Sequence, residues 1–184
     1  LALADLDIDG GTDIGAAIAD ADLFIVDDGA GGTNRKTTAA RIKTYIGASN
    51  SPAFRATSSS GNTVANQTYT KLTFDTEAFD TDGDFASSRF TPQVAGKYKI
   101  TAQTRLNSSS DFGDNIIAIY KNGSISSSRQ MSHFHYECNR VTGIFTMNGS
   151  SDYVEVYFFH NQGGNTDTDG GTTLNFFEGF KLIE

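Results

Sequence analysis

Two groups of aspartates have the residue type and spacing that could bind a cation. Asp80, Asp82 and Asp84 occupy alternate positions, and Asp167 and Asp169 form a second, smaller group. Calcium takes about six to eight oxygen ligands, which clustered aspartates and backbone carbonyls in a loop can supply. The first group is therefore a candidate calcium site, although Asp-Gly stretches of this kind also form ordinary turns.

Histidine and cysteine offer less chemistry. His133 and His135 would point to the same side of a strand, but zinc needs further ligands that converge with them. Cys138 is the only cysteine, which excludes an intrachain disulfide, and its neighbour Glu137 disfavours the thiolate that a nucleophile requires. The sequence contains no nucleophile elbow. We therefore expect a protein that is not an enzyme and uses no cofactor other than the candidate calcium.

Composition narrows the range of partners. The 184 residues include 22 acidic and 14 basic side chains, which gives a formal net charge of −8. This charge disfavours non-specific binding to nucleic acids and to anionic membranes. The apolar runs are far shorter than a membrane span, while 38% hydrophobic residues suffice for a globular core. We expect a folded protein with neither nucleic-acid binding nor membrane insertion.

Charge distinguishes residues 1–47 from the rest of the chain. Within this segment the acidic side chains come first and the basic side chains follow. The acids are Asp5, Asp7, Asp9, Asp13, Asp20, Asp22, Asp27 and Asp28, and the bases are Arg35, Lys36, Arg41 and Lys43. Such a dipolar segment suits an assembling element in which acids of one copy meet bases of another. Solvated surface charge is the equally open alternative.

The same segment has the pattern of only a few secondary-structure elements. Leu6 and Ile8 alternate with aspartates as in a half-buried strand, and residues 23–26 predict a strand buried on both faces. Residues 37–46 predict a short helix that ends at Gly47. These elements bury too little surface to fold alone. We therefore expect a stalk or attachment segment that either self-associates or packs on the following domain.

Residues 48–184 form the second predicted domain, and its pattern is almost wholly β. Short runs rich in β-branched and aromatic residues alternate with polar turns, and Asn122-Gly123 and Asn148-Gly149 predict hairpin turns. The expected strands are residues 53–57, 68–75, 89–92, 96–106, 115–121, 140–147, 152–160 and 174–183. About eight strands at this spacing predict an all-β sandwich or jelly roll.

A series of short segments within residues 52–183 occurs in a characteristic order. The segments are Pro52-Ala53-Phe54, Lys71-Leu72-Thr73-Phe74-Asp75, Arg89-Phe90-Thr91-Pro92, Ala95-Gly96-Lys97-Tyr98, Ile119-Tyr120-Lys121-Asn122-Gly123, Asp152-Tyr153-Val154-Glu155-Val156 and Asn175-Phe176-Phe177-Glu178-Gly179-Phe180. Together they resemble the complement C1q-like domain, which is related in fold to tumour necrosis factor. The resemblance implies a jelly-roll β-sandwich that forms homotrimers, often with calcium near the apex of the trimer.

Two features depart from this family. Ser151 replaces the glycine that usually precedes Asp152, and no collagen-like Gly-X-Y repeat precedes the domain in this sequence. The collagen-stalked role of complement proteins is therefore not implied.

Parts of the first segment resemble a different group of proteins. Residues 7–15, 22–29 and 35–46 resemble parts of tail-fibre and appendage proteins of marine bacteriophages. Together the two resemblances imply a stalk followed by a trimeric knob, located in an extracellular appendage of a virion. Such proteins bind host-surface glycans or proteins without catalysis. The first segment would then contact other virion proteins.

The implied trimer predicts two sets of functional residues. An interface would bury aromatic side chains along the trimer axis; its candidates are Tyr153, Tyr157, Phe159, Phe176 and Phe180. Long polar loops at residues 58–63, 107–115 and 161–173 would bind the host, or would only connect strands. The candidate ligand-binding residues in these loops are Asn107, Asp111, Asp114, Asn161, Asn165, Asp167 and Asp169.

Two other functions fit the same sequence. A purely structural phage subunit, such as a decoration, collar or fibre protein, would share the fold and the trimer without binding a receptor. A monomeric carbohydrate-binding module would present exposed aromatic rings, often including Trp, which this chain lacks. Oligomeric state and cell binding distinguish the three functions.

Overall fold

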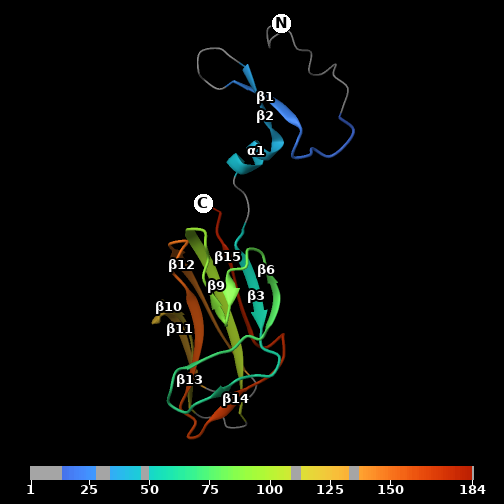
Figure 1. Cartoon of the computed structure of the whole chain (residues 1–184). Helices are drawn as coiled ribbons and strands as arrows, with labels where there is room; N and C mark the ends of the chain where they lie inside the picture. The colour runs from blue at the N-terminus through green and yellow to red at the C-terminus, as the bar shows by residue number, and fades with distance from the viewer. Residues whose placement is uncertain (1–13, 28–33, 47–49, 109–112, 133–136, 184) are drawn as a thin grey trace. The chain divides into compact units, whose positions relative to one another are not determined.

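The structure is a computed structural model of the chain, which divides into two compact units, Leu1–Ala48 and Ser49–Glu184 (Figure 1). The residues that it describes are 14–27, 34–46, 50–108, 113–132 and 137–183. The strand expected around Leu6 and Ile8 lies outside them. Among the described residues, no helix is both long enough and apolar enough to cross a membrane.

The first unit contains an antiparallel hairpin and one short helix. β1 (Leu23–Asp27) pairs with β2 (Asn34–Thr38), and α1 (Ala39–Ile46) follows directly. The prediction that β1 is buried on both faces is wrong, because Leu23 is 59% exposed and Ile25 is 60% exposed. A two-stranded hairpin has no second layer to cover its side chains. α1 also has no buried residue, so the described part of this unit leaves apolar side chains at its surface.

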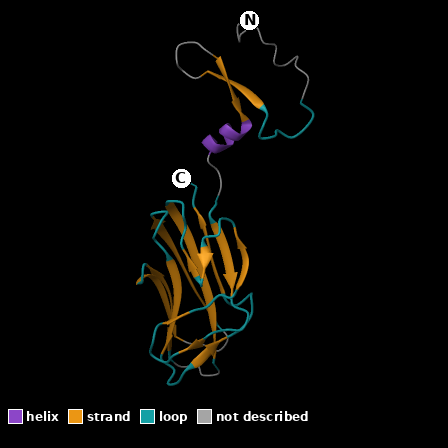
Figure 2. Cartoon of the chain, in the orientation of Figure 1, coloured by secondary structure: helices purple, strands orange, loops and turns teal. Residues whose placement is uncertain are grey.

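The second unit confirms the predicted all-β sandwich, because two antiparallel sheets face each other (Figures 1 and 2). The first sheet is six-stranded, with the order β11-β10-β13-β8-β7 and β5 also paired with β13. Its strands are β5 (Thr70–Lys71), β7 (Phe85–Ala86), β8 (Arg89–Phe90), β10 (Asp114–Lys121), β11 (Ser124–Ser132) and β13 (Val154–His160).

The second sheet is seven-stranded, with the order β4-β14-β9-β15-β3-β6 and β12 also paired with β9. Its strands are β3 (Ala53–Thr57), β4 (Thr63–Val64), β6 (Thr76–Asp80), β9 (Gly96–Asn107), β12 (Cys138–Met147), β14 (Thr166–Thr168) and β15 (Phe176–Lys181). Side chains alternate between the two sides of each strand, so each sheet has one face toward the core and one outward face.

Aromatic rings join the two sheets in the core. The Phe54 ring of β3 stacks on the Phe90 ring of β8, with ring centroids 4.2 Å apart, and on the Phe85 ring of β7 at 5.1 Å. It also meets the Phe177 ring of β15 edge-on at 4.8 Å. All four side chains are buried. Because β7 and β8 belong to one sheet and β3 and β15 to the other, this cluster fixes the two sheets against each other.

The two Asn-Gly pairs form different turns. Asn122 and Gly123 both have positive φ, 51° and 80°, and they connect β10 to β11 as the predicted tight hairpin. The prediction of a second hairpin at Asn148-Gly149 is wrong, because β12 and β13 pair with strands of different sheets. Asn148 instead begins the loop that crosses from one sheet to the other.

Candidate functional site

The outward face of the six-stranded sheet carries a cluster of aromatic rings. On β13, Val154, Val156 and Phe158 enter the core, so Tyr157 and Phe159 point outward. The ring of Tyr157 lies 4.0 Å from the ring of Tyr120 on β10, measured between centroids. The ring of Tyr69, just before β5, lies 5.2 Å from that of Phe159 and 6.0 Å from that of Tyr120. These four rings, Tyr69, Tyr120, Tyr157 and Phe159, are named the tyrosine cluster.

The hydroxyl groups of Tyr120 and Tyr157 remain protonated at neutral pH. Burial raises the pKa of Tyr120, and the neighbouring Tyr69 raises it further. Burial also raises the pKa of Tyr157, with an additional contribution from the negative charge of Glu155. The Tyr157 hydroxyl donates a hydrogen bond to Glu155 Oε2 at 3.4 Å. The cluster therefore combines apolar ring surface with hydroxyl groups that donate and accept hydrogen bonds.

Glu155 is a buried carboxylate that organises the charges beside the cluster. Its side chain is only 4% exposed, yet Lys71 Nζ lies 2.7 Å and Arg89 Nε 2.9 Å from its Oε1 atom. Burial alone would raise the pKa of Glu155, but the hydrogen bonds and charges of Lys71 and Arg89 outweigh this effect and lower the pKa. The Arg89 guanidinium also lies over the ring of Tyr153, 3.8 Å from its centroid. Arg89 is therefore held from two sides.

An open cavity of about 630 Å³ lies beside these charges. Its lining is polar, and we name it the Arg89 pocket. The residues that line it are Lys71, Gly83, Asp84, Ala86, Ser87, Arg89, Thr91 and Gln93. Burial raises the pKa of Asp84, and so do the nearby charges of Asp80 and Asp82. Lys71 and Arg89 are thus shared between the pocket and the outward face of the six-stranded sheet.

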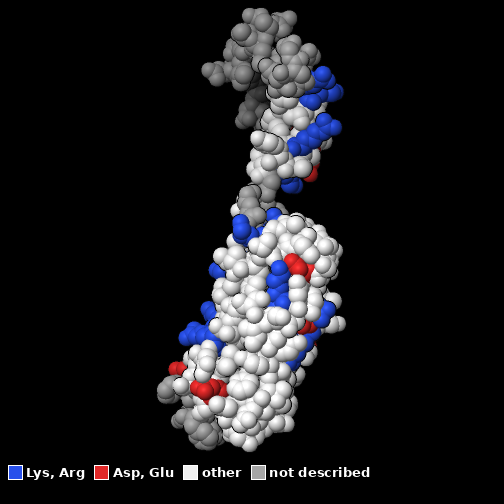
Figure 3. Space-filling view, turned by 90° about the vertical axis from the view of Figure 1, so that its left-hand side faces the viewer, with Lys and Arg blue, Asp and Glu red and all other residues white. Residues whose placement is uncertain are grey.

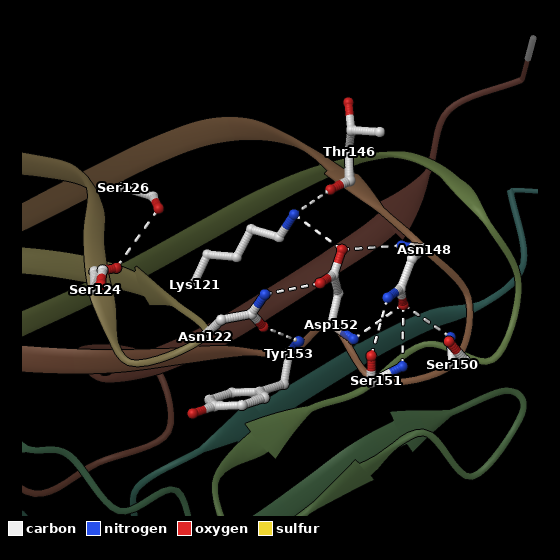
Figure 4. Close-up of polar contacts among 10 residues, drawn as sticks. All are labelled: Lys121, Asn122, Ser124, Ser126, Thr146, Asn148, Ser150, Ser151, Asp152 and Tyr153. Carbon is white, nitrogen blue, oxygen red and sulfur yellow. Dashed lines mark hydrogen bonds and ion pairs between the residues drawn. The ribbon is translucent and has the colours of Figure 1, made fainter.

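The turns at one end of the sandwich hold Tyr153 in place (Figure 4). The Asn122 side chain donates to Asp152 Oδ1 at 2.7 Å and accepts the backbone N–H of Tyr153 at 3.0 Å. Lys121 Nζ lies 2.9 Å from Asp152 Oδ2. The hydrogen bond from Asn122 and the adjacent Lys121 lower the pKa of Asp152. In the next loop, Asn148 Oδ1 accepts the backbone N–H groups of residues 150, 151 and 152.

The outward face of the seven-stranded sheet is built differently. Ile144 of β12 is 65% exposed, Phe180 of β15 is 37% exposed, and Phe79 of β6 is 50% exposed. Ile144 and Phe180 flank the same residue of β9, Lys99, in the strand register. Around Phe180 the exposed polar groups pair along the sheet, as in the ion pair of Arg55 with Glu178. This face therefore combines exposed apolar side chains with partly exposed ion pairs.

The five aromatic residues predicted for the trimer interface do not share one face. Tyr153 precedes β13, and Tyr157 and Phe159 lie on β13 in the six-stranded sheet. Phe176 and Phe180 lie on β15 in the other sheet. Phe176 is buried and lies beneath the Arg55 guanidinium, 4.4 Å from its ring centroid. The expectation of a single aromatic face is therefore wrong. Of the five predicted residues, only Phe180 is exposed on the seven-stranded face.

Two of the predicted ligand loops, residues 58–63 and 161–173, lie together at the end of the sandwich near β14 (Figure 1). Their polar residues mostly bind other parts of the chain. Asp167 pairs in register with Asn107 and accepts a hydrogen bond from Thr63 at 2.6 Å, and Asp169 forms an ion pair with Arg105.

The remaining candidates at this end behave similarly. Asn165 accepts a hydrogen bond from the backbone of Asn66 at 3.2 Å, and Asn161 accepts one from the backbone of Asp114 at 2.6 Å. Asp111 lies outside the described residues. The arrangement stabilises these loops against one another, and a role in ligand binding stays a prediction.

The candidate calcium site is not formed by this arrangement. Asp80 accepts the backbone N–H groups of Gly83 and Phe85 at 3.1 and 2.8 Å. Asp82 accepts the Ser51 hydroxyl at 2.6 Å, and Asp84 accepts the backbone N–H of residue 93. Among the described residues, no three His, Cys, Asp or Glu side chains converge to hold a metal ion. His133 and His135 lie outside the described residues.

On the face of the second unit that Figure 3 shows, basic and acidic side chains lie in small groups with broad uncharged areas between the groups. This face does not present an extended field of one sign to a ligand.

Two antiparallel sheets with this strand order define a jelly-roll sandwich of the C1q and tumour necrosis factor type, as the sequence predicted. The globular domain of zebrafish complement 1qA protein is 21% identical, with a TM-score of 0.51, and the match covers 72% of this chain and 98% of that domain. Murine APRIL at pH 5.0 is 13% identical, with a TM-score of 0.50, and the match covers 71% of this chain and 99% of the APRIL chain. These likenesses establish the fold. No family model and no curated protein sequence matches the chain.

Sequence reasoning named Tyr153, Tyr157, Phe159 and Asp84 for other roles but missed Lys71, Arg89 and Glu155, which organise the charges of this site. Tyr153, Glu155 and Tyr157 alternate along the sequence, which was sufficient to place them on one side of a strand. Their partners Lys71 and Arg89 lie far away in the sequence and meet Glu155 only because β5 and β8 both pair with β13. No local pattern could reveal that pairing.

Proposed function

We propose that the chain forms a trimeric, non-enzymatic knob that recognises or adheres to a host surface, as part of a virion appendage. One observation carries the trimer: the outward face of the seven-stranded sheet exposes Phe79, Ile144 and Phe180 together. Covering such a face with two further copies would remove these side chains from water. The C1q and tumour necrosis factor type of fold supports the same assembly.

The geometry of this face favours contact between copies. Ile144 and Phe180 lie on either side of β9, and Phe79 lies two strands away from Phe180, beyond β3. The ion pair of Arg55 and Glu178 lies between Phe79 and β9. Aromatic and other apolar side chains with an arginine among them match the composition of interfaces between folded subunits, in which aromatic residues and Arg are enriched.

The first unit supports attachment to another protein. Its described residues include exposed Leu23, Ile25 and Ile46, and its helix has no buried residue. An element of this kind gains stability by packing against a partner. We propose that other virion proteins or further copies of the chain provide that partner.

Solution mass tests the trimer. Light scattering of the full chain is expected to give three times the chain mass of 19.7 kDa. The variant Ile144→Lys should be monomeric and folded, because a charge within the proposed interface is costly to bury. Ile125→Lys is the matched control, since Ile125 is exposed on the other sheet, and it should stay trimeric. A monomeric wild-type chain at micromolar concentration would contradict the proposal.

Cell binding tests the recognition role. The labelled full chain, added to a panel of marine bacteria, should bind some strains saturably and leave others unlabelled. A trimer that binds none of them would instead indicate a purely structural subunit.

A further inference from the structure

The Arg89 pocket and the adjoining tyrosine cluster have the chemistry of a saccharide site. A sugar ring has apolar C–H faces, which pack on aromatic rings, and hydroxyl groups, which both donate and accept hydrogen bonds. The outward face of the six-stranded sheet presents the partly buried rings of Tyr120, Tyr153 and Tyr157. Beside them, Lys71 and Arg89 offer donors from one wall of the pocket, and Asp84 lines the same pocket.

The polar groups are held in place before any ligand arrives. Glu155, which is almost fully buried, fixes Lys71 and Arg89 by hydrogen bonds of 2.7 and 2.9 Å. Lys71 also donates to the backbone carbonyl of Ser87 at 3.0 Å, and the Asp84 carboxylate is anchored by the backbone N–H of Gln93 at 3.1 Å. Groups that are already oriented lose little conformational entropy on binding.

The charges of the site select against a strongly charged ligand. Two cations, Lys71 and Arg89, are matched by two carboxylates, Glu155 and Asp84, and the nearby Asp80 and Asp82 add further negative charge. The chain as a whole has a net charge of −8, which repels acidic ligands. A neutral, hydroxyl-rich molecule matches this balance. The cavity volume of about 630 Å³ lies within the range of small-ligand pockets, roughly 300–1,000 Å³.

We propose that the Arg89 pocket binds an uncharged pyranose residue of a glycan, whose hydroxyl groups bond to Arg89, Lys71 and Asp84 and whose ring lies beside the stacked pair of Arg89 and Tyr153. This inference rests on the proposed recognition role and names its ligand class and its place. It moves recognition from the loops at residues 107–115 and 161–173 to the outward face of the six-stranded sheet.

Titration of the full chain tests the site. The probes are the methyl glycosides of glucose, galactose, mannose and N-acetylglucosamine, with N-acetylneuraminic acid as the acidic comparison. Tyrosine fluorescence reports binding directly, because the chain contains no tryptophan, and amide NMR shifts locate it. At least one neutral glycoside should bind saturably, with a dissociation constant of about 1 mM, and shift the amides of Arg89 and Tyr153. Binding of the acidic sugar alone, shifts confined to the loops, or no saturable binding would overturn the proposal.

Variants separate binding from folding. Tyr153→Ala should weaken binding by roughly fivefold, and Tyr153→Phe should retain it because the ring remains. Arg89→Ala should weaken binding at least as much, whereas Arg129→Ala, an exposed arginine on β11 of the same sheet, should not. If Arg89→Ala lowers the melting temperature, Gln93→Ala provides the test, because Gln93 lines the pocket and, within the described residues, its side chain donates to the carbonyl of the neighbouring Thr91. Equal binding by wild type and all of these variants would contradict the site.

The same samples distinguish this inference from the proposed trimer. A trimeric mass without sugar binding would contradict the pocket alone. Sugar binding by a monomer would contradict the trimer and favour a carbohydrate-binding module.

Discussion

The outward faces of the two sheets differ in how much their own side chains contact and pair with one another. On the six-stranded sheet, the four rings of the tyrosine cluster touch each other, and Glu155 is 4% exposed between Lys71 and Arg89. On the seven-stranded sheet, Ile144 and Phe180 are exposed, and Glu178 of the ion pair with Arg55 is 35% exposed. The six-stranded face is packed around the tyrosine cluster and Glu155, with Ile125 exposed at its edge, whereas the seven-stranded face leaves Phe79, Ile144 and Phe180 in water.

This difference indicates two kinds of use for two sides of one sandwich. A face whose groups already contact each other keeps its shape in water and can present fixed groups to a small ligand. A face with exposed aliphatic and aromatic side chains is stabilised when another protein surface covers it. The comparison can be tested by substitutions that affect both faces, one face, or one turn.

The largest effect is expected at the core on which both faces rest. Phe54→Ala removes a ring that contacts Phe85, Phe90 and Phe177 across the two sheets. It should lower the free energy of unfolding by ~3–5 kcal/mol, measured by urea denaturation. Ile125→Ala, on an exposed side chain outside the proposed trimer interface, is the control and should change the stability of the sandwich by less than ~1 kcal/mol. Similar losses for both variants would show that Phe54 does not join the sheets.

A smaller effect is expected when matched glutamates of the two faces are neutralised. Glu155→Gln should cost ~1–3 kcal/mol at neutral pH, because it leaves two cations beside a buried amide. Glu178→Gln should cost at most ~1 kcal/mol, since its ion pair with Arg55 is partly exposed to water. Equal costs would remove the distinction between an internally satisfied face and an open one.

The same pair predicts a difference in acid sensitivity. The pKa of Glu155 is lower in the folded protein than its ordinary value, so its stabilising contribution is complete above the unfolded pKa of about 4.3 and is lost as the pH falls through the folded pKa. Acid titration of stability below about pH 5 should therefore be less steep in Glu155→Gln than in wild type. An unchanged slope would contradict the charge assignment at Glu155.

The smallest effect is expected at the turn that positions Tyr153. Asn122→Ala removes hydrogen bonds to Asp152 and to the Tyr153 backbone, and it places a Cβ-bearing residue without turn preference at a φ of 51°. The expected cost is ~1–2 kcal/mol. Asn122→Gly keeps the positive φ without strain and should recover part of this loss. Identical costs for the two variants would show that backbone strain contributes nothing at this turn.

Much of the fold could be predicted because its strands follow local rules. Alternation located β3, β9 and β10 within a residue or so, and the Asn122-Gly123 pair gave the correct hairpin. β11 was missed because its nine residues, Ser124–Ser132, are mostly serine and polar residues with no apolar alternation. A strand at the edge of a sheet needs no buried side, so the pattern that reveals a strand is absent there.

The sites could be predicted less well, because they depend on pairing between distant segments. Alternation places Tyr157 and Phe180 on strand faces, but only the pairing of β13 with β10 and of β15 with β9 assigns them to different sheets. The same dipeptide, Asn-Gly, gave a hairpin at residue 122 and a crossing loop at residue 148, for the same reason. In each case the local sequence specifies the geometry of a strand or turn, and the pairing between strands determines which sheet or connection it belongs to.

The polar edge strand β11 affects how readily neighbouring copies of the domain aggregate through their sheet edges. It borders the six-stranded sheet, and its register with β10 shifts between Ile119 and Tyr120, so Ser126 is left out of the pairing. Long, flat, apolar edges recruit strands from other molecules and seed fibrils, whereas a bulged edge of serines resists such growth. This edge of the domain therefore resists edge-to-edge aggregation when many copies stand close together.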